Sequence, residues 1–295
     1  VMNVSGKHPE TTFFSLVQDD KYGYLWFMTL TGLYVMKYED DGELTPIDIS
    51  TYLTGSSRLY SEIVKDKNNN LWVGAFSEGV IFINFERPPV QNYSLDIVRQ
   101  RMGLTPSIKA LSVDKDGLVW LGLNRYGLCF YDKETNKAVM HSDIPGLSIF
   151  QEIETINNIK EIQHSQEHWI SCNHQYVYVL KKTGKRIDFL RTVDVNAGNN
   201  YISSGDKVIF EDSKGNVWIG MLGGIVKVTP NNMVTAVSDL PAVTDITEDA
   251  EGHIWASSEQ VGLCRLSPQG RGYQTTLFDK YTQGLNTSNI QSVKA

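Results

Sequence analysis

The sequence is poor in cysteine, in basic residues and in long apolar runs, and each shortage excludes a class of protein. Its three cysteines, Cys129, Cys172 and Cys264, are too few for a disulfide scaffold, and their odd number leaves at least one thiol free. With 27 basic and 34 acidic residues the net charge is −7, which argues against a nucleic-acid partner because phosphates need a basic face. No apolar run approaches the ~20 residues that cross a bilayer.

The composition is that of a soluble globular protein. Hydrophobic residues make up 41% of the chain and charged residues 21%, whereas disordered segments have fewer core-forming residues and more charge. A chain of 295 residues is long enough for one large domain or two small ones, with a sizeable buried core.

The tryptophans of the chain recur at nearly constant intervals. Successive tryptophans are separated by 46, 48, 49, 49 and 37 residues, and none lies outside this series. An aspartate stands six positions before five of them, and glycine or asparagine stands three positions before the same five. Because aspartate and glycine at this spacing are typical of a tight turn, the sequence contains the same turn motif five times. The tryptophans are Trp26, Trp72, Trp120, Trp169, Trp218 and Trp255, and the aspartates are Asp20, Asp66, Asp114, Asp212 and Asp249.

Each turn motif lies between segments with the composition of β-strands. Nine positions before the five tryptophans the residue is always aliphatic, and six or seven positions after them a glycine precedes an apolar residue. Such residues between turn signals predict strands. Each repeat therefore predicts four short strands: one before the turn, one bearing the tryptophan, one led by glycine, and a weaker fourth, such as residues 44–49.

These repeats predict an all-β fold, a β-propeller of four-stranded blades. A lone four-stranded sheet cannot bury both faces, and radial stacking protects its edge strands. We expect the tryptophans to be core residues between blades. Residues 290–293 match 108–111, which predicts either a seven-bladed propeller or part of a longer double propeller. The prediction is one domain over 1–295, with blades at 13–50, 59–100, 107–145, 156–195, 205–240 and 242–282 and a partial blade at 288–295.

The repeat reads apolar-x-x-Asp-x-x-Gly-x-apolar-Trp-apolar, followed by Gly-Leu. No tryptophan precedes aspartate as in WD repeats, and Gly-Gly, which marks kelch blades, occurs only at residues 223–224. The Asp-box of sialidases has its aspartate five positions before the tryptophan, which this chain lacks. The best instances, residues 111–122 and 209–220, closely resemble the regulator-propeller repeat in sensor regions of Bacteroidetes hybrid two-component systems. The resemblance extends over residues 14–295, and the fourth repeat departs from it.

The resemblance implies an extracytoplasmic, periplasmic sensor region of a larger protein with a membrane helix, a histidine kinase and a response regulator. It implies an oligosaccharide ligand and control of glycan-utilisation genes. The expected partners are neighbouring propeller and stalk domains of the same protein and a second copy of the protein in a homodimer. Membrane contact would come only through a downstream segment. We expect this part of the chain to need no cofactor, to bind no nucleic acid and to have no enzyme activity.

The motif aspartates are interpreted as turn residues and not as catalytic or metal-binding carboxylates. One per blade is too dispersed for glycoside hydrolysis, which needs two carboxyl groups within about 9.5 Å. Residues 164–174 contain three histidines and a cysteine, but residues four apart in a strand are ~13 Å apart, too far to share a metal. Only Cys172 and His174 are expected to be neighbours. Aligning Ile159 with Ile108 makes the turn of this degenerate repeat two residues shorter.

Two further groups of residues have a structural interpretation. Cys129 and Cys264 occupy the same position in the third and sixth repeats and are expected to be free, buried thiols. Residues 181–186, which read Lys-Lys-Thr-Gly-Lys-Arg, are expected to form a turn with solvated lysines.

A ligand is expected on the face opposite the Asp-x-x-Gly turns. There the loops between second and third strands and the links between blades come together in a propeller. Aromatic rings, amides and a guanidinium group suit a sugar, whose C–H faces stack and whose hydroxyls form hydrogen bonds. The candidate ligand-binding residues are Arg58, Tyr60, Asn124, Arg125, Tyr126, Asn173, His174, Tyr201, Glu259 and Gln260.

Two other functions stay open at the level of the sequence. A polysaccharide lyase or hydrolase on this scaffold would need clustered catalytic side chains, and His174 with Tyr126 and Glu259 is the one loose candidate set. A protein-interaction scaffold would instead present exposed apolar patches on one face without a polar pocket.

Overall fold

A computed structural model describes most of the chain, which divides into two units, residues 1–108 and 109–295. The described residues are 13–19, 22–29, 32–38, 44–47, 60–75, 79–84, 90–93, 98–99, 107–153, 155–201, 203–270, 272–281, 285 and 287–294.

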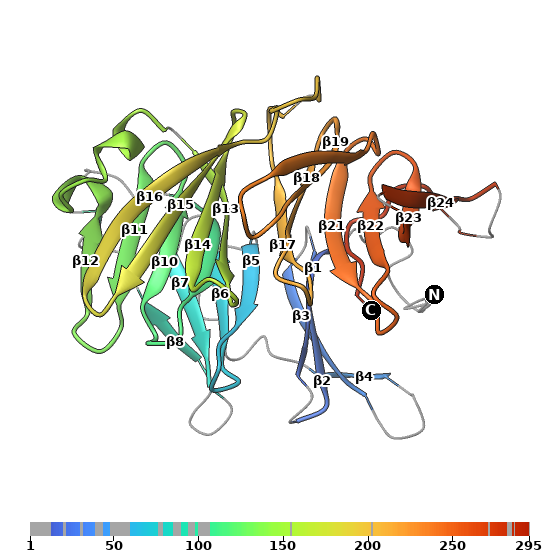
Figure 1. The fold of residues 1–295 in the computed structure, drawn as a ribbon. Helices are drawn as coiled ribbons and strands as arrows, with labels where there is room; N and C mark the ends of the chain where they lie inside the picture. The colour runs from blue at the N-terminus through green and yellow to red at the C-terminus, as the bar shows by residue number, and fades with distance from the viewer. Residues whose placement is uncertain are drawn as a thin grey trace. The chain divides into compact units, whose positions relative to one another are not determined.

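The first unit contains two four-stranded antiparallel sheets, in each of which every strand pairs with the next along the chain (Figure 1). Their apolar side chains meet in one core that includes Trp26, Met28, Ile63 and Val73. The first sheet consists of β1 (Phe13–Asp19), β2 (Tyr24–Thr29), β3 (Gly32–Tyr38) and β4 (Leu44–Ile47), and the second of β5 (Tyr60–Lys65), β6 (Leu71–Ala75), β7 (Gly79–Ile83) and β8 (Val90–Tyr93).

The second unit contains four sheets of the same kind. Two 3₁₀ helices, η1 (His141–Asp143) and η2 (Ser148–Gln151), lie between its first two sheets in the chain. The sheet of the third blade consists of β9 (Ile108–Val113), β10 (Val119–Leu123), β11 (Gly127–Asp132) and β12 (Lys137–Met140), and that of the fourth blade of β13 (Ile156–Ile162), β14 (Glu167–Cys172), β15 (Tyr176–Thr183) and β16 (Arg186–Asp194). The sheet of the fifth blade consists of β17 (Val208–Glu211), β18 (Val217–Met221), β19 (Gly224–Val228) and β20 (Val234–Ser238), and that of the sixth blade of β21 (Val243–Glu248), β22 (Ile254–Ser258), β23 (Gly262–Gln269) and β24 (Gly272–Phe278).

This arrangement confirms the predicted fold class, an all-β propeller of four-stranded blades, and the described residues form six such blades. Within the second unit the first strands of neighbouring blades contact one another, β13 with β17 and β17 with β21. Among the described residues, no helix has the length and apolarity that a bilayer crossing requires.

The tryptophans on the second strands pack mainly into the cores between blades. Trp120 joins residues of the fourth blade such as Ile170 in one core, and Trp218 joins Ile254 of the sixth blade in another. Five of the six side chains are buried, whereas Trp255 is half-buried, lies beside Phe278 and is covered by the Arg265 guanidinium.

The glycine two positions after the tryptophan sets how closely neighbouring sheets approach. A Cβ on Gly122 would lie 2.7 Å from Ile156 Cγ2, and a Cβ on Gly220 would lie 2.4 Å from Val243 Cγ1. Contacts this short do not occur between real Cβ atoms and side chains. Because these glycines have no Cβ, each leaves room for the first strand of the next blade.

The fourth blade corrects the predicted alignment of its turn. Ile159 pairs with Ile170, the residue after Trp169, as Ile209 pairs with Ile219 after Trp218. Ile159 therefore corresponds to Ile209 of the repeat and not to Ile108. It lies ten residues before its tryptophan where Ile209 lies nine before, so the turn is one residue longer and not two residues shorter.

Residues 287–294, where a seventh repeat was expected to begin, pack on the sixth blade without forming a strand. The Ile290 amide donates to the Ser258 carbonyl at 2.9 Å, and the Thr244 hydroxyl donates to the Ile290 carbonyl at 2.6 Å. The Asp245 carboxylate accepts the Ser292 hydroxyl at 2.7 Å and the next backbone amide at 3.1 Å.

Candidate functional site

Four described turns share one carboxylate arrangement. One aspartate oxygen accepts the indole N–H of the tryptophan six residues later, and the other accepts the backbone N–H groups two and four residues later. In the third blade Trp120 Nε1 lies 3.1 Å from Asp114 Oδ2. A buried indole N–H needs such an acceptor. The aspartates in this arrangement are Asp66, Asp114, Asp212 and Asp249; Asp20 lies outside the described residues.

The fourth blade supplies the same acceptor from a different place. The Trp169 indole donates to Glu167 Oε2 at 3.2 Å, and Arg191 on β16 holds both oxygens of that carboxylate at 2.8 and 2.9 Å. Burial alone would raise the pKa of Glu167, but the bonds and charge of Arg191 hold it below its usual value. A strand residue and its arginine thus replace the missing turn aspartate.

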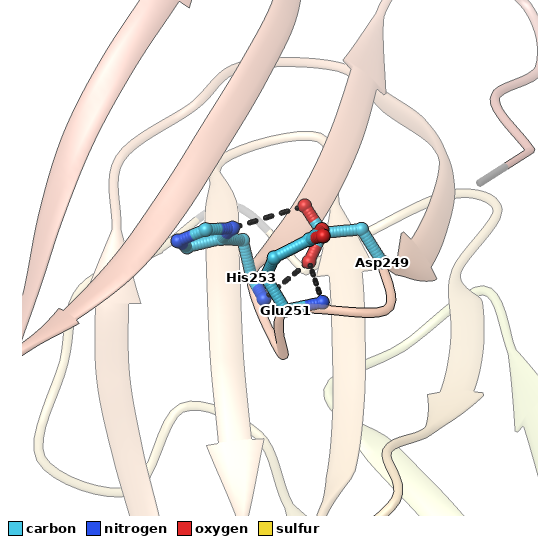
Figure 2. A group of neighbouring side chains, drawn as sticks. All are labelled: Asp249, Glu251 and His253. Atoms are coloured by element: carbon cyan, nitrogen blue, oxygen red, sulfur yellow. Dashed lines mark hydrogen bonds and ion pairs between the residues drawn. The ribbon is translucent and has the colours of Figure 1, made fainter.

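One turn places three groups that ligate metals close together. The ligand atoms of Asp249, Glu251 and His253 lie within 4.8 Å of one another (Figure 2). His253 Nδ1 lies 3.0 Å from Asp249 Oδ2. At the equivalent position of the preceding blade, the side-chain amide of Asn216 donates to Asp212. The Asp249 carboxylate also accepts the indole and two backbone N–H groups. These bonds account for the cluster as a variant of the repeated turn.

The basic segment at 181–186 corrects a prediction. Lys182 is not solvated: its side chain is 10% exposed, and its Nζ lies 2.9 Å from Asp114 Oδ2 and 2.6 Å from Asp116 Oδ2 in the turn of the third blade. Lys185 and Arg186 are exposed, as expected for a turn. Lys182 of the fourth blade therefore forms ion pairs with two carboxylates of the third blade.

A buried histidine lies beside this ion pair. His168 stacks on Trp120 with ring centroids 3.8 Å apart, and neither of its ring nitrogens has a hydrogen-bond partner among the described residues. Burial lowers its pKa to about 4; the Asp114 charge opposes that shift and the Lys182 charge adds to it. His168 is thus neutral, and its ring packs between the third and fourth blades.

The cysteines are free and buried, as predicted. Burial raises the pKa of Cys129 to about 12 and that of Cys264 to about 11, so both thiols stay protonated at neutral pH.

Most candidate ligand-binding residues lie in the equivalent loops of three blades. Within a blade this loop and the Asp-x-x-Gly turn stand at opposite ends of the second strand, so the loops lie away from the turns. The β10–β11 loop holds Asn124, Arg125 and Tyr126, the β14–β15 loop holds Asn173 and His174, and the β22–β23 loop holds Glu259 and Gln260.

Three loop residues already have partners within the protein. Asn124 Oδ1 accepts the Thr155 hydroxyl at 3.0 Å, Asn173 Oδ1 accepts the Asn157 amide at 2.5 Å, and Glu259 Oε1 accepts the Gln291 amide at 3.2 Å. Each of these side chains keeps further hydrogen-bonding capacity.

Two candidates outside these loops are engaged in packing. Tyr60 is the first residue of β5 and packs against the core of the first unit. The Tyr201 ring covers Gly224, where an added Cβ would lie 2.7 Å from Tyr201 Cε2. Arg58 lies outside the described residues. Among the described residues no hydrogen bond joins any two of Tyr126, His174 and Glu259, the candidate set for an enzyme.

A polar cluster on the loop side extends from the core between the third and fourth blades, where the Cys172 and Tyr178 side chains pack, to Lys207 before the fifth blade. Cys172 Sγ lies 3.2 Å from His174 Nε2, as expected for these two residues, and the Tyr178 hydroxyl lies 3.3 Å from the same nitrogen. The Lys207 ammonium, before β17, donates to the Cys172 carbonyl at 2.7 Å. Lys207 is not among the predicted residues, because a single lysine before a strand has the pattern of a surface residue.

Burial shifts the pKa of every titratable group in this cluster. It lowers the pKa of Lys207 to about 8 and raises that of Tyr178 to about 12. It also raises the Cys172 pKa and lowers the His174 pKa, and the nearby Lys207 charge further lowers that of His174. At neutral pH the lysine is the charged member of the four.

No family model matches the sequence, and no curated protein sequence matches it either. Solved structures match its fold. The extracellular domain of BT3049 from B. thetaiotaomicron, described as a hybrid two-component system, gives a TM-score of 0.66 at 19% identity over 94% of this chain and 36% of that chain. The extracellular domain of BT4673 from the same organism, described likewise, gives 0.69 at 17% identity over 97% and 36%.

A third similar structure has another role. PorZ, an essential surface component of the type-IX secretion system of Porphyromonas gingivalis, gives a TM-score of 0.69 at 19% identity over 99% of this chain and 45% of that chain. This chain thus spans less than half the length of each of the three proteins. At such identities the likeness concerns the fold alone: the chain has the β-propeller fold found in extracellular domains of hybrid two-component systems.

Proposed function

We propose that this chain is the ligand-sensing propeller of a hybrid two-component sensor, located outside the cytoplasm. The observation that carries the proposal is the propeller fold, shared over 94% and 97% of this chain with extracellular domains of two such systems. The regulator-propeller repeat motif, which does not depend on that comparison, supports the same assignment. In this proposal the whole protein adds a membrane helix, a histidine kinase and a response regulator, and it acts in the periplasm as a homodimer with neighbouring propeller and stalk domains.

The proposed ligand is an oligosaccharide, and the regulated genes are those for glycan use. Amides, a guanidinium group and aromatic rings lie in corresponding loops of the third, fourth and sixth blades. In the fourth blade the side chains of Asn173 and His174 are exposed, and the Tyr176 ring stands beside them. Groups of this kind bind sugars by stacking and by hydrogen bonds to hydroxyls.

Calorimetric titration with a panel of neutral and acidic oligosaccharides tests this function. We expect saturable binding of at least one member and a weaker association constant in Tyr126→Ala and His174→Ala, which remove loop side chains. Lys214→Ala, an exposed change in a turn at the opposite end of its blade, serves as the control and is expected to bind normally.

Failure of every oligosaccharide to bind would contradict sugar sensing. New reducing ends or unsaturated uronates after incubation with polysaccharides would instead favour the lyase or hydrolase alternative.

A further inference from the structure

Lys207 is a buried cation for which the described residues provide no counter-charge. The side chain is 2% exposed, and its ammonium donates to the carbonyls of Cys172 at 2.7 Å and Gly205 at 3.5 Å. Among the described residues no carboxylate lies within ion-pairing distance of Nζ. The neighbouring carboxylate of Asp206 is exposed and acts on Lys207 only at longer range.

A lysine this deeply buried is normally paired with an anion or well hydrogen-bonded. An ammonium has three N–H groups, but only the Cys172 carbonyl lies at a short distance, whereas the Gly205 carbonyl lies at the limit of a hydrogen bond. The site therefore has the donor and the charge of an anion-binding centre.

The neighbouring side chains favour an anion over a metal cation. Burial keeps the Cys172 thiol protonated, and a thiol must lose its proton to bind a metal well. The Lys207 charge would also repel a cation beside His174. The Tyr178 hydroxyl can donate to His174 Nε2, and the neutral imidazole then carries its one N–H on Nδ1, from which it can donate to an anionic oxygen.

Exposed residues flank Lys207 on the loop side. Residues 204–206, which carry the weakly bound Gly205 carbonyl, are exposed, and so is His174. Tyr176 is 38% exposed, and its ring stands edge-on to His174 with centroids 5.8 Å apart. An aromatic ring at the rim can stack on the C–H face of a sugar whose charged group points inward.

We propose that Lys207, with His174, binds the carboxylate or sulfate group of an acidic sugar, which replaces the Gly205 carbonyl as acceptor. Tyr176 stacks on the ring of the same sugar. This inference rests on the proposed function as an oligosaccharide sensor and names the chemical class of the ligand. It adds Lys207 and Tyr176 to the candidate residues of the loop face, with Tyr178 as the residue that orients the His174 ring.

The test compares acidic and neutral forms of the same sugar by calorimetry. Three probes are titrated: a glucuronate-containing oligosaccharide, its carboxyl-reduced counterpart, and a sulfated oligosaccharide with neutral rings. Lys207→Met removes the charge but keeps much of the length of the side chain. The control is Lys227→Met, because Lys227 lies over the rings of Trp218 and Tyr273 and outside the cluster.

The wild type and Lys227→Met are expected to bind the glucuronate or the sulfated probe at least tenfold more tightly than the carboxyl-reduced one. Lys207→Met is expected to lose ten- to a hundredfold in affinity for the charged probe and to bind the reduced probe as the wild type does. Tighter binding of the glucuronate probe or of the sulfated probe shows whether the site prefers a carboxylate or a sulfate group. His174→Gln, a change at an exposed residue, gives a second reading if Lys207→Met does not fold, and a several-fold loss is expected.

Equal affinity of wild type and Lys207→Met for the charged probe would overturn the inference. So would binding of the carboxyl-reduced form alone, which would leave the sensing function intact. If no charged or neutral oligosaccharide binds, both this inference and the proposed function fail.

Discussion

At the scale of single residues, the burial of polar groups is the main physical constraint on this propeller. An indole N–H in a core needs an acceptor, and the turn aspartate provides it while it also closes the turn. Asp212 accepts the Trp218 indole at 2.8 Å and the side-chain amide of Asn216 at 2.8 Å. The sequence predicted such aspartates as turn formers, but it did not show that the same carboxylate holds the tryptophan, because the pattern records spacing and not direction.

His168 is expected to make stability depend on pH. Its folded pKa of about 4 lies below its ordinary value of 6.5, so the unfolded chain binds the proton more readily between these values. Stability should therefore rise as pH increases from 4 to 6.5, and this histidine should contribute roughly 3 kcal/mol to that change.

His168→Phe keeps the aromatic stack on Trp120 and removes the titration. Urea unfolding at pH 7.5 and pH 4.5 should show a smaller loss of stability in this variant than in the wild type. His164→Gln, at an exposed histidine, is the control and should behave as the wild type does. An identical pH dependence in His168→Phe and the wild type would show that this group does not titrate as expected.

At the scale of elements, the distance between sheets depends on small residues in the second strands. Gly122→Ala would bring its Cβ to 2.7 Å from Ile156 Cγ2 and 2.8 Å from Ala110 Cβ, so the blades would have to separate. We expect a loss of about 1 to 3 kcal/mol in the free energy of unfolding.

Chemical denaturation of Gly122→Ala measures this loss. The matched control is Gly272→Ala, where an added Cβ has no heavy atom closer than 4.0 Å, and its stability should stay close to that of the wild type. If Gly122→Ala were as stable as the control, the close approach of the two sheets would not be a constraint.

The strands and their order were predictable because alternating apolar residues and turn motifs are local signals. The irregular fourth repeat was misaligned by three residues, since Ile156, Ile159 and Ile162 are equally spaced and any of them fits the aliphatic position. Only the pairing of Ile159 with Ile170 selects the register. The loop positions of Asn124, Asn173 and Gln260 followed from the repeat, whereas the Lys207 cluster depends on contacts between separate blades, which no local pattern encodes.

At the scale of the whole molecule, the second unit continues past the sixth sheet through residues 287–294. Asp245 on β21 accepts the Ser292 hydroxyl and the Val293 amide, and the Lys294 ammonium lies 3.7 Å away. Residues 290–293 of this segment match the sequence at 108–111.

Asp245→Ala should loosen this segment without unfolding the sixth blade. Amide hydrogen exchange at Val293 is expected to be about tenfold faster or more, because its acceptor is lost. Exchange at Cys264, in β23 of the same blade, should change little, because this strand pairs with β22 and β24 and its Cys264 partners are Ala256 and Leu277. The control is Asp239→Asn at an exposed aspartate, and unchanged exchange at Val293 in Asp245→Ala would contradict the packing described above.

Glu167 and Arg191 have a consequence for how such repeats are recognised. In five of the six blades the described residues include an acceptor for the indole, and this acceptor comes from the turn or, in the fourth blade, from the tryptophan's own strand. A sequence profile that requires an aspartate six positions before the tryptophan misses a blade whose indole acceptor lies outside the turn. A profile that accepts any carboxylate able to reach the indole would also recognise a blade such as the fourth.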